Sequence, residues 1–175
     1  MNKKQNKPAR AAHYTRFASL EAYYKSCGVS VKEEGAVPQG RRAWLYGRAA
    51  VGLDAMTALG RQHGQTARRA EGMGYGIVGL SEDRGTGRSL DRPGLEEMRQ
   101  AAREHRFDVL FVHGASRLSR DMLLAVELIR GLKNLGVQVY AVKEHMWLTE
   151  NPLLDLFMDA QWAPAETGPG FTQNM

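Results

Sequence analysis

The sequence predicts an α/β domain in which a mainly parallel sheet lies between layers of helices. Short apolar runs of β type alternate with longer segments of helical periodicity, and glycine or proline stands at the boundaries. Of the 175 residues, 43% are hydrophobic, which is enough to bury a core. Strands that are joined through helices form right-handed crossovers and run parallel, so we expect a three-layer α/β sandwich.

The elements follow one another regularly from residue 42 onward. Strands are predicted at residues 43–48, 75–80, 107–112 and 137–142. Helices are predicted at residues 53–71, 93–105 and 119–135. Pro93 is expected in the first turn of its helix and Gly136 just after the end of the last one. Asn151 and Pro152 open a further helix, which reaches about Trp162.

The two ends of the chain differ from this regular part. Residues 1–41 are predicted to form a basic, partly disordered extension, residues 42–162 the folded domain, and residues 163–175 a disordered tail. The extension holds one short predicted helix at residues 17–27. The sequence leaves open whether its aromatic side chains pack on the domain: Phe17, Tyr23 and Tyr24. It also leaves open whether the apolar stripe of the final helix packs on the domain or pairs with another protomer: Leu153, Leu154, Leu156, Phe157, Met158 and Trp162.

Charge and cysteine content narrow the class of protein. Residues 1–42 hold nine Lys or Arg against three Glu, whereas the rest of the chain is nearly balanced. This basic arm either follows a nucleic-acid backbone or is an inert solvated tail. Cys27 is the only cysteine and the five histidines lack zinc spacing, so we expect no disulfide, metal or cofactor. No apolar run approaches eighteen residues and no signal peptide is evident, which predicts a cytoplasmic protein without a membrane partner.

Arginines gathered in two turn-rich segments predict a phosphate site. Residues 83–94 contain Arg84, Arg88 and Arg92, and residues 116–121 contain Arg117 and Arg120. A guanidinium group stays charged and pairs bidentately with phosphate oxygens. Any single surface arginine is more often solvated or salt-bridged. Two groups that each follow a predicted strand nevertheless match the rule that open α/β sheets bind ligands beyond their strand ends.

Four motifs resemble the catalytic domain of the serine recombinases, the resolvase and invertase family, over roughly residues 43–160. Residues 46–50, Tyr-Gly-Arg-Ala-Ala, are similar to the family's Tyr-x-Arg-x-Ser. Residues 58–62, followed by Gly74, are similar to its Ser-Leu-x-x-Gln helix. Residues 83–94 match its stretch that ends in Asp-Arg-Pro-Gly, and residues 117–121 match its Arg-Leu-Ser-Arg-Asp. The correct order and spacing make the four together a strong signal.

The resemblance implies a site-specific DNA recombinase. Members of the family cut DNA by in-line attack of a serine hydroxyl on a phosphodiester, without metal or ATP, and arginines stabilise the developing charge. By position, the implied catalytic residues are Arg48, Arg92, Arg117 and Arg120, with Ala50 at the nucleophile position. The implied supporting residues are Tyr46, Gln62, Asp83 and Ser116. DNA is the implied partner, together with a second copy of the chain or an intact recombinase.

The chain departs from the family pattern at the nucleophile. Ala50 has no hydroxyl, so the covalent route cannot begin there, and Ser116 replaces the acidic residue before the second arginine pair. Ser116 itself is better read as a turn residue at a strand end than as a substitute nucleophile, and Ser89 and Ser119 are weaker candidates still. The long family helix and the DNA-binding domain after it are expected to be missing. We therefore expect an inactive recombinase domain that retains phosphate contacts; the alternatives are a non-catalytic dimerisation or regulatory module and a decayed mobile-element fragment.

Overall fold

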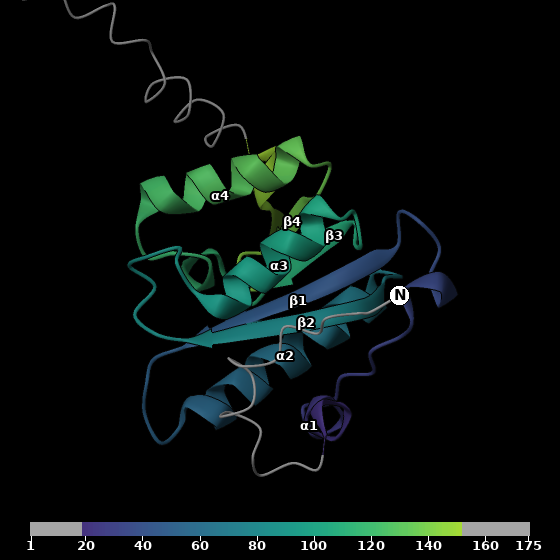
Figure 1. Cartoon of the computed structure of the whole chain (residues 1–175), viewed down its shortest axis with the longest axis horizontal. Coiled ribbons are helices and arrows are strands. Elements are labelled where there is room, and N and C mark those ends of the chain that lie inside the picture. The colour runs from purple at the N-terminus through teal and green to yellow at the C-terminus, as the bar shows by residue number, and fades with distance from the viewer. Residues whose placement is uncertain (1–18, 152–175) are drawn as a thin grey trace, which may run out of the picture.

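A computed structural model of the chain describes residues 19–151, which form a five-stranded sheet with helices on both faces (Figure 1). The strands are β1 (Arg42–Ala49), β2 (Gly76–Arg84), β3 (Val109–Val112), β4 (Gln138–Ala141) and β5 (Met146–Trp147). The α-helices are α1 (Leu20–Ser26), α2 (Ala55–Gly72), α3 (Pro93–Arg103) and α4 (Met122–Asn134). Three single-turn 3₁₀ helices are η1 (Glu34–Ala36), η2 (Ala115–Arg117) and η3 (Leu148–Glu150).

The strand order is β2-β1-β3-β4-β5, and every pairing among the first four strands is parallel. The α/β fold with a mainly parallel sheet is therefore confirmed. Only β5 runs antiparallel, and it pairs Trp147 with Tyr140 of β4. This two-residue strand is absent from the elements predicted above, because so short a segment carries no periodicity.

Helices α1 and α2 cover one face of the sheet, and α3 and α4 cover the other (Figure 1). Strand β1 is buried on both faces, as expected for the centre of a parallel sheet. Its side chains alternate between two cores: Leu45 packs on the α2 side, whereas Trp44 and Tyr46 pack on the α3 and α4 side. This alternation decides which residues further along β1 can reach the same side of the sheet.

Predicted and observed boundaries differ most at β2, which runs four residues beyond its predicted end. The extra residues are polar, and three of the four are buried because their side chains have hydrogen-bond partners. Two of these partners lie on β1. Trp44 Nε1 donates to Ser81 Oγ at 3.0 Å, and the Tyr46 hydroxyl donates to Asp83 Oδ2 at 2.9 Å. Hydrophobicity alone therefore ends this strand too early.

The helix boundaries differ less and have local causes. Pro93 is the first residue of α3, and Gly136 follows the end of α4 with φ +81°, both as predicted. Helix α4 begins at Met122 rather than residue 119, because the Asp121 side chain accepts from two backbone amides of its first turn. The helix predicted at residues 152–162 lies outside the described residues, as do Phe17 and the apolar stripe.

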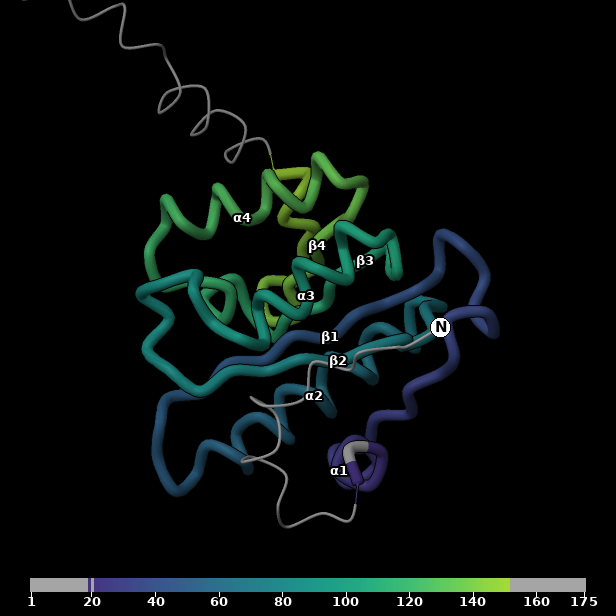
Figure 2. The backbone as a smooth tube through the Cα atoms, in the orientation of Figure 1, coloured from purple at the N-terminus to yellow at the C-terminus, as the bar shows by residue number. Residues whose placement is uncertain are grey.

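The segment that precedes β1 wraps around the edge of the sheet (Figure 2). Val29 packs in the core beside α2, and the Lys32 amide donates to Ile77 O of the edge strand β2 at 2.7 Å. Val37 then packs in the opposite core. On that side Arg106 Nε donates to Glu34 Oε1 at 2.6 Å. Residues 19–41 thus contact both layers of the domain, whereas the disorder predicted for part of residues 1–41 stays a prediction.

Within residues 19–151, no helix is both long and apolar enough to cross a bilayer.

Candidate functional site

Arg48, near the end of β1, is the centre of the site and is fully buried. All three nitrogens of its guanidinium group donate to backbone carbonyls: Nη1 to Gly85 at 2.7 Å, Nη2 to Ser116 at 2.7 Å, and Nε to Arg117 at 3.1 Å. These carbonyls belong to the loop after β2 and to η2. The side chain therefore ties three separate chain segments together at the carboxyl ends of the strands.

The loop after β2 can approach Arg48 because of Gly87. This residue has φ +77°, a left-handed conformation that favours glycine. A Cβ atom here would lie 2.5 Å from Cζ of Arg48. A larger side chain would force the loop away from the guanidinium group.

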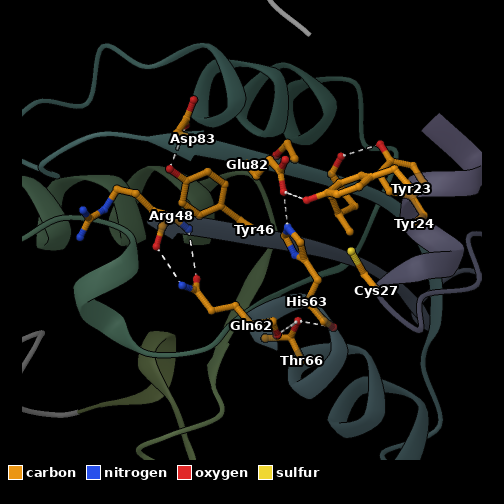
Figure 3. Close-up of polar contacts among 12 residues, drawn as sticks. Tyr23, Tyr24, Cys27, Tyr46, Arg48, Gln62, His63, Thr66, Glu82 and Asp83 are labelled. Carbon is orange, nitrogen blue, oxygen red and sulfur yellow. Dashed lines mark hydrogen bonds and ion pairs between the residues drawn. The ribbon is translucent and has the colours of Figure 1, made fainter. Parts of the chain in front are cut away.

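Gln62 and Arg117 hold the backbone of Arg48 from two sides. The Gln62 side chain, on α2, accepts from the Arg48 amide at 3.2 Å and donates to its carbonyl at 3.0 Å (Figure 3). Arg117 Nη1 donates to the same carbonyl at 3.0 Å. The Arg117 guanidinium is thereby bonded to Arg48, the residue two positions before Ala50.

Asp83 connects β1 with the start of α3. Its carboxylate accepts from the Tyr46 hydroxyl and from the amides of Gly94 and Leu95, at 2.7 to 2.9 Å. These amides lie in the first turn of α3, where free N–H groups point outward and favour a negative charge. The residue just before α3 is Arg92, whose guanidinium lies over the Tyr46 ring at 5.8 Å and donates to Leu118 O.

The site has a strong excess of positive charge. The pKa of Arg48 is lowered by burial and by the positive charges of Arg117, Arg92 and Arg120. Arg117, Arg92 and Arg120 thus all add positive charge around the Arg48 guanidinium. Burial also raises the pKa of Asp83, and its contacts with backbone amides, with Tyr46 and with Arg92 oppose that rise.

Several guanidinium nitrogens at the site have no hydrogen-bond partner among the described residues. They are Nε and Nη1 of Arg92, Nε of Arg117 and Nε of Arg84, and all are buried. Arg92 is 8% exposed, so little of its side chain reaches solvent. Buried charged donors without a partner are costly, and an anion is the group that would satisfy them.

Ala50 follows the last residue of β1 and is exposed. Of the candidate substitute serines, Ser119 is buried and its hydroxyl donates to Gly87 O at 3.0 Å. The Ser89 hydroxyl accepts from the Asp91 amide. Ser116 is exposed, and its carbonyl, not its hydroxyl, is bound to Arg48.

The structure brings the residues implied by the resemblance to one end of the sheet, but their environments differ. Arg92 and Arg117 have unpartnered nitrogens, whereas the nitrogens of Arg48 are bonded to carbonyls. Arg120 is exposed, and its amide donates to Gly87 O. The arrangement suits an anion held by Arg92 and Arg117, with Arg48 as the internal brace.

A buried polar network that was not predicted from the sequence lies on the other face of β1 and β2. It consists of Tyr23, His63 and Glu82. The available signal was a charged residue inside the run of β2, together with a histidine next to Gln62. No group of three His, Cys, Asp or Glu side chains within residues 19–151 is arranged to hold a metal ion.

We predict that Arg48→Ala lowers the free energy of unfolding by about 3 kcal/mol or more, because it leaves three carbonyls without their charged donor. Arg120→Ala removes the same charge from an exposed side chain and should change stability by less than about 0.5 kcal/mol. Urea unfolding of both variants checks this. Equal effects would contradict the bracing role of Arg48.

Comparisons with known proteins agree with this geometry. The family model described as "Resolvase, N terminal domain" matches residues 45–167. The N-terminal catalytic domain of TP901-1 integrase is 21% identical, with a TM-score of 0.57 over 75% of this chain and 98% of that chain. A resolvase family site-specific recombinase from Streptococcus pneumoniae is 18% identical, with a TM-score of 0.58 over 74% of this chain and 89% of that chain.

The C-terminal catalytic domain of ISC1926 TnpA, an IS607-like serine recombinase, is 23% identical, with a TM-score of 0.54 over 68% of this chain and 77% of that chain. No curated protein matches the chain. At these identities the solved structures establish the fold, and the family model establishes the family. The chain belongs to the resolvase N-terminal domain family and has the fold of serine recombinase catalytic domains.

Proposed function

We propose that this resolvase-type domain binds the phosphate backbone of DNA through its arginine cluster but does not cleave it. One observation carries the proposal: buried guanidinium nitrogens of Arg92 and Arg117 lack partners, while Ala50 stands at the position of the family nucleophile. Binding needs only the arginines. Covalent cleavage needs a hydroxyl as well.

The charge balance of the site supports anion binding. The Asp83 carboxylate is already bound to Tyr46 and to two amides of α3. It therefore cannot neutralise four neighbouring arginines. A phosphodiester would supply the missing negative charge and accept from several donors at once.

The surroundings of the serines support the absence of cleavage. A nucleophile needs a hydroxyl that is free to be activated and that faces the phosphate. The Ser119 hydroxyl is bound to a carbonyl inside the fold. Ser116 lies on η2, where its backbone carbonyl accepts from the Arg48 guanidinium.

We predict that the protein forms no covalent adduct with nicked or gapped duplex DNA. Ala50→Ser alone should also fail, because Ser116 replaces the family's acidic residue beside the arginines. Intact-mass spectrometry after incubation with DNA and nuclease digestion measures the adduct. A phosphoseryl adduct in either protein would refute the proposed loss of activity.

The domain should bind duplex DNA without sequence preference, with a Kd of roughly 10⁻⁴ to 10⁻⁶ M at physiological salt. Replacing Arg117 and Arg120 with Ala should weaken binding and flatten its salt dependence. A matched control replaces two exposed helix arginines, Arg68 and Arg103, and removes the same charge away from the site. Fluorescence anisotropy of a labelled duplex against salt compares them, and urea unfolding confirms that both variants fold.

Deleting residues 1–10 in the same assay separates the basic arm from the site, because it removes Lys3, Lys4, Lys7 and Arg10. If that deletion abolishes binding while the Arg117 and Arg120 variant binds like the parent, the arginine site does not hold DNA.

A second candidate function is pairing with another recombinase-fold subunit. Large apolar side chains are exposed at the carboxyl edge of the sheet: Val51 at 80%, Leu53 at 101%, Met122 at 67% and Leu123 at 52%. They lie in the β1–α2 connection and at the start of α4, on the same edge as the arginine site. Large exposed apolar side chains are typical of contact surfaces, and we infer that these two segments form one such surface.

If this surface mediates self-association, Leu53→Ser with Met122→Ser should convert a dimer into a monomer without loss of stability. Sedimentation velocity over a range of concentrations measures this. A parent chain that stays monomeric, or a variant that still dimerises, would exclude self-association through this surface.

A further inference from the structure

The β1–β2 pair carries polar networks on both of its faces at the same level. In the register of the two strands, Gly47 pairs with Glu82 and the next residue, Arg48, pairs with Asp83. Successive residues of a strand point to opposite faces. Arg48 and Asp83 therefore face α3, whereas Glu82 faces α1 and α2.

The network on the α1 and α2 side is compact and buried. The Tyr23 hydroxyl donates to Glu82 Oε2 at 2.7 Å, and His63 Nε2 lies 2.8 Å from the same oxygen (Figure 3). Tyr23 and His63 are 1% and 0% exposed. The three side chains come from α1, α2 and β2, and hydrogen bonds of a carboxylate in a buried setting are strong.

The two network residues that do not lie on α1, His63 and Glu82, are each next in sequence to a residue of the arginine site. His63 follows Gln62, which holds both backbone groups of Arg48. Glu82 precedes Asp83, which holds Tyr46 and the start of α3. The geometry thus joins the two faces through rigid backbone rather than through a direct contact.

Strand β1 also contacts this network, through Gly47. A Cβ atom on Gly47 would lie 2.8 Å from Cε1 of His63, so the ring packs directly against the strand at the residue before Arg48. Glycine at position 47 allows α2 to approach this closely. The network consequently fixes α2, β1 and β2 relative to one another at the level of the site.

We propose that Tyr23, His63 and Glu82 are positioning residues of the arginine site. Helix α1, which carries Tyr23, therefore helps to hold the site in place. The inference rests on the proposed anion binding only for its functional consequence. Without the Tyr23 hydroxyl, Glu82 loses one of its donors, and the end of β2 and the middle of α2 gain freedom. The amides that report this are those of Arg48, Gly94 and Leu95, because they donate to Gln62 and Asp83.

The test compares Tyr23→Phe with Tyr24→Phe in the full chain. The two residues are neighbours on α1, and each variant removes one hydroxyl; that of Tyr24 donates to Leu80 O at 3.3 Å rather than to the carboxylate. Native-state hydrogen exchange by NMR should show the Arg48, Gly94 and Leu95 amides exchanging about tenfold faster in Tyr23→Phe, relative to the amides of α4. Tyr24→Phe should leave them unchanged. Glu82→Gln, a second variant of similar shape, should act like Tyr23→Phe.

Duplex affinity is measured on the same proteins and should fall in Tyr23→Phe but not in Tyr24→Phe. Similar exchange in the two Tyr variants, or acceleration that extends equally to α4, would overturn the positioning role. If the parent binds no duplex although the three amides respond as expected, the proposed function fails and the positioning role stands. If binding persists and the amides do not respond, only the positioning role fails.

Discussion

The site depends on the burial of one guanidinium group. Its nitrogens donate to three backbone carbonyls, that of Gly85 in the loop after β2 and those of Ser116 and Arg117 in the single turn η2. Arginine is suited to this task because its donors are fixed in one plane and its charge persists when buried. The side chain therefore sets the conformation of two loops, and these loops carry the arginines that remain free to meet an anion.

Positive charge is concentrated here without full compensation from carboxylates. Asp83 is used to orient Tyr46 and the start of α3, and burial disfavours its charged form. Holding such a cluster together costs stability, which is typical of sites organised for a ligand rather than for folding. The polar network on the opposite face of β1 and β2 adds hydrogen bonds of its own. Both faces of this strand pair therefore stabilise the fold, whereas the proposed anion contact lies on the Arg48 face.

The sequence predicts most of the framework because periodicity and turn residues report directly on strands and helices. The alternating pattern indicates the parallel sheet, and Pro93 and Gly136 mark helix ends correctly. The predicted β2 is too short because its polar end depends on tertiary partners. These four residues form a strand because Trp44 and Tyr46 bond to two of them. The resemblance brings the arginines together, but it cannot tell that Arg48 is a brace while Arg92 has unpartnered donors. The sequence alone does not decide whether Tyr23 packs on the domain, since nothing local indicates a partner nearly sixty residues away.

Residues 19–41, which wrap around the edge of the sheet before β1, limit how far the chain can be truncated from its N-terminus. The family model begins at residue 45, inside β1, whereas Val29 and Val37 fill opposite cores and Lys32 pairs with the outer strand. A polypeptide cut at the family boundary would expose the backbone of β2, along with apolar surface on both sides of it. Unpaired strand edges of this kind recruit other chains. The folding unit of this chain therefore extends N-terminally beyond the family match, and we expect a chain cut at residue 45 to aggregate more readily than the full chain.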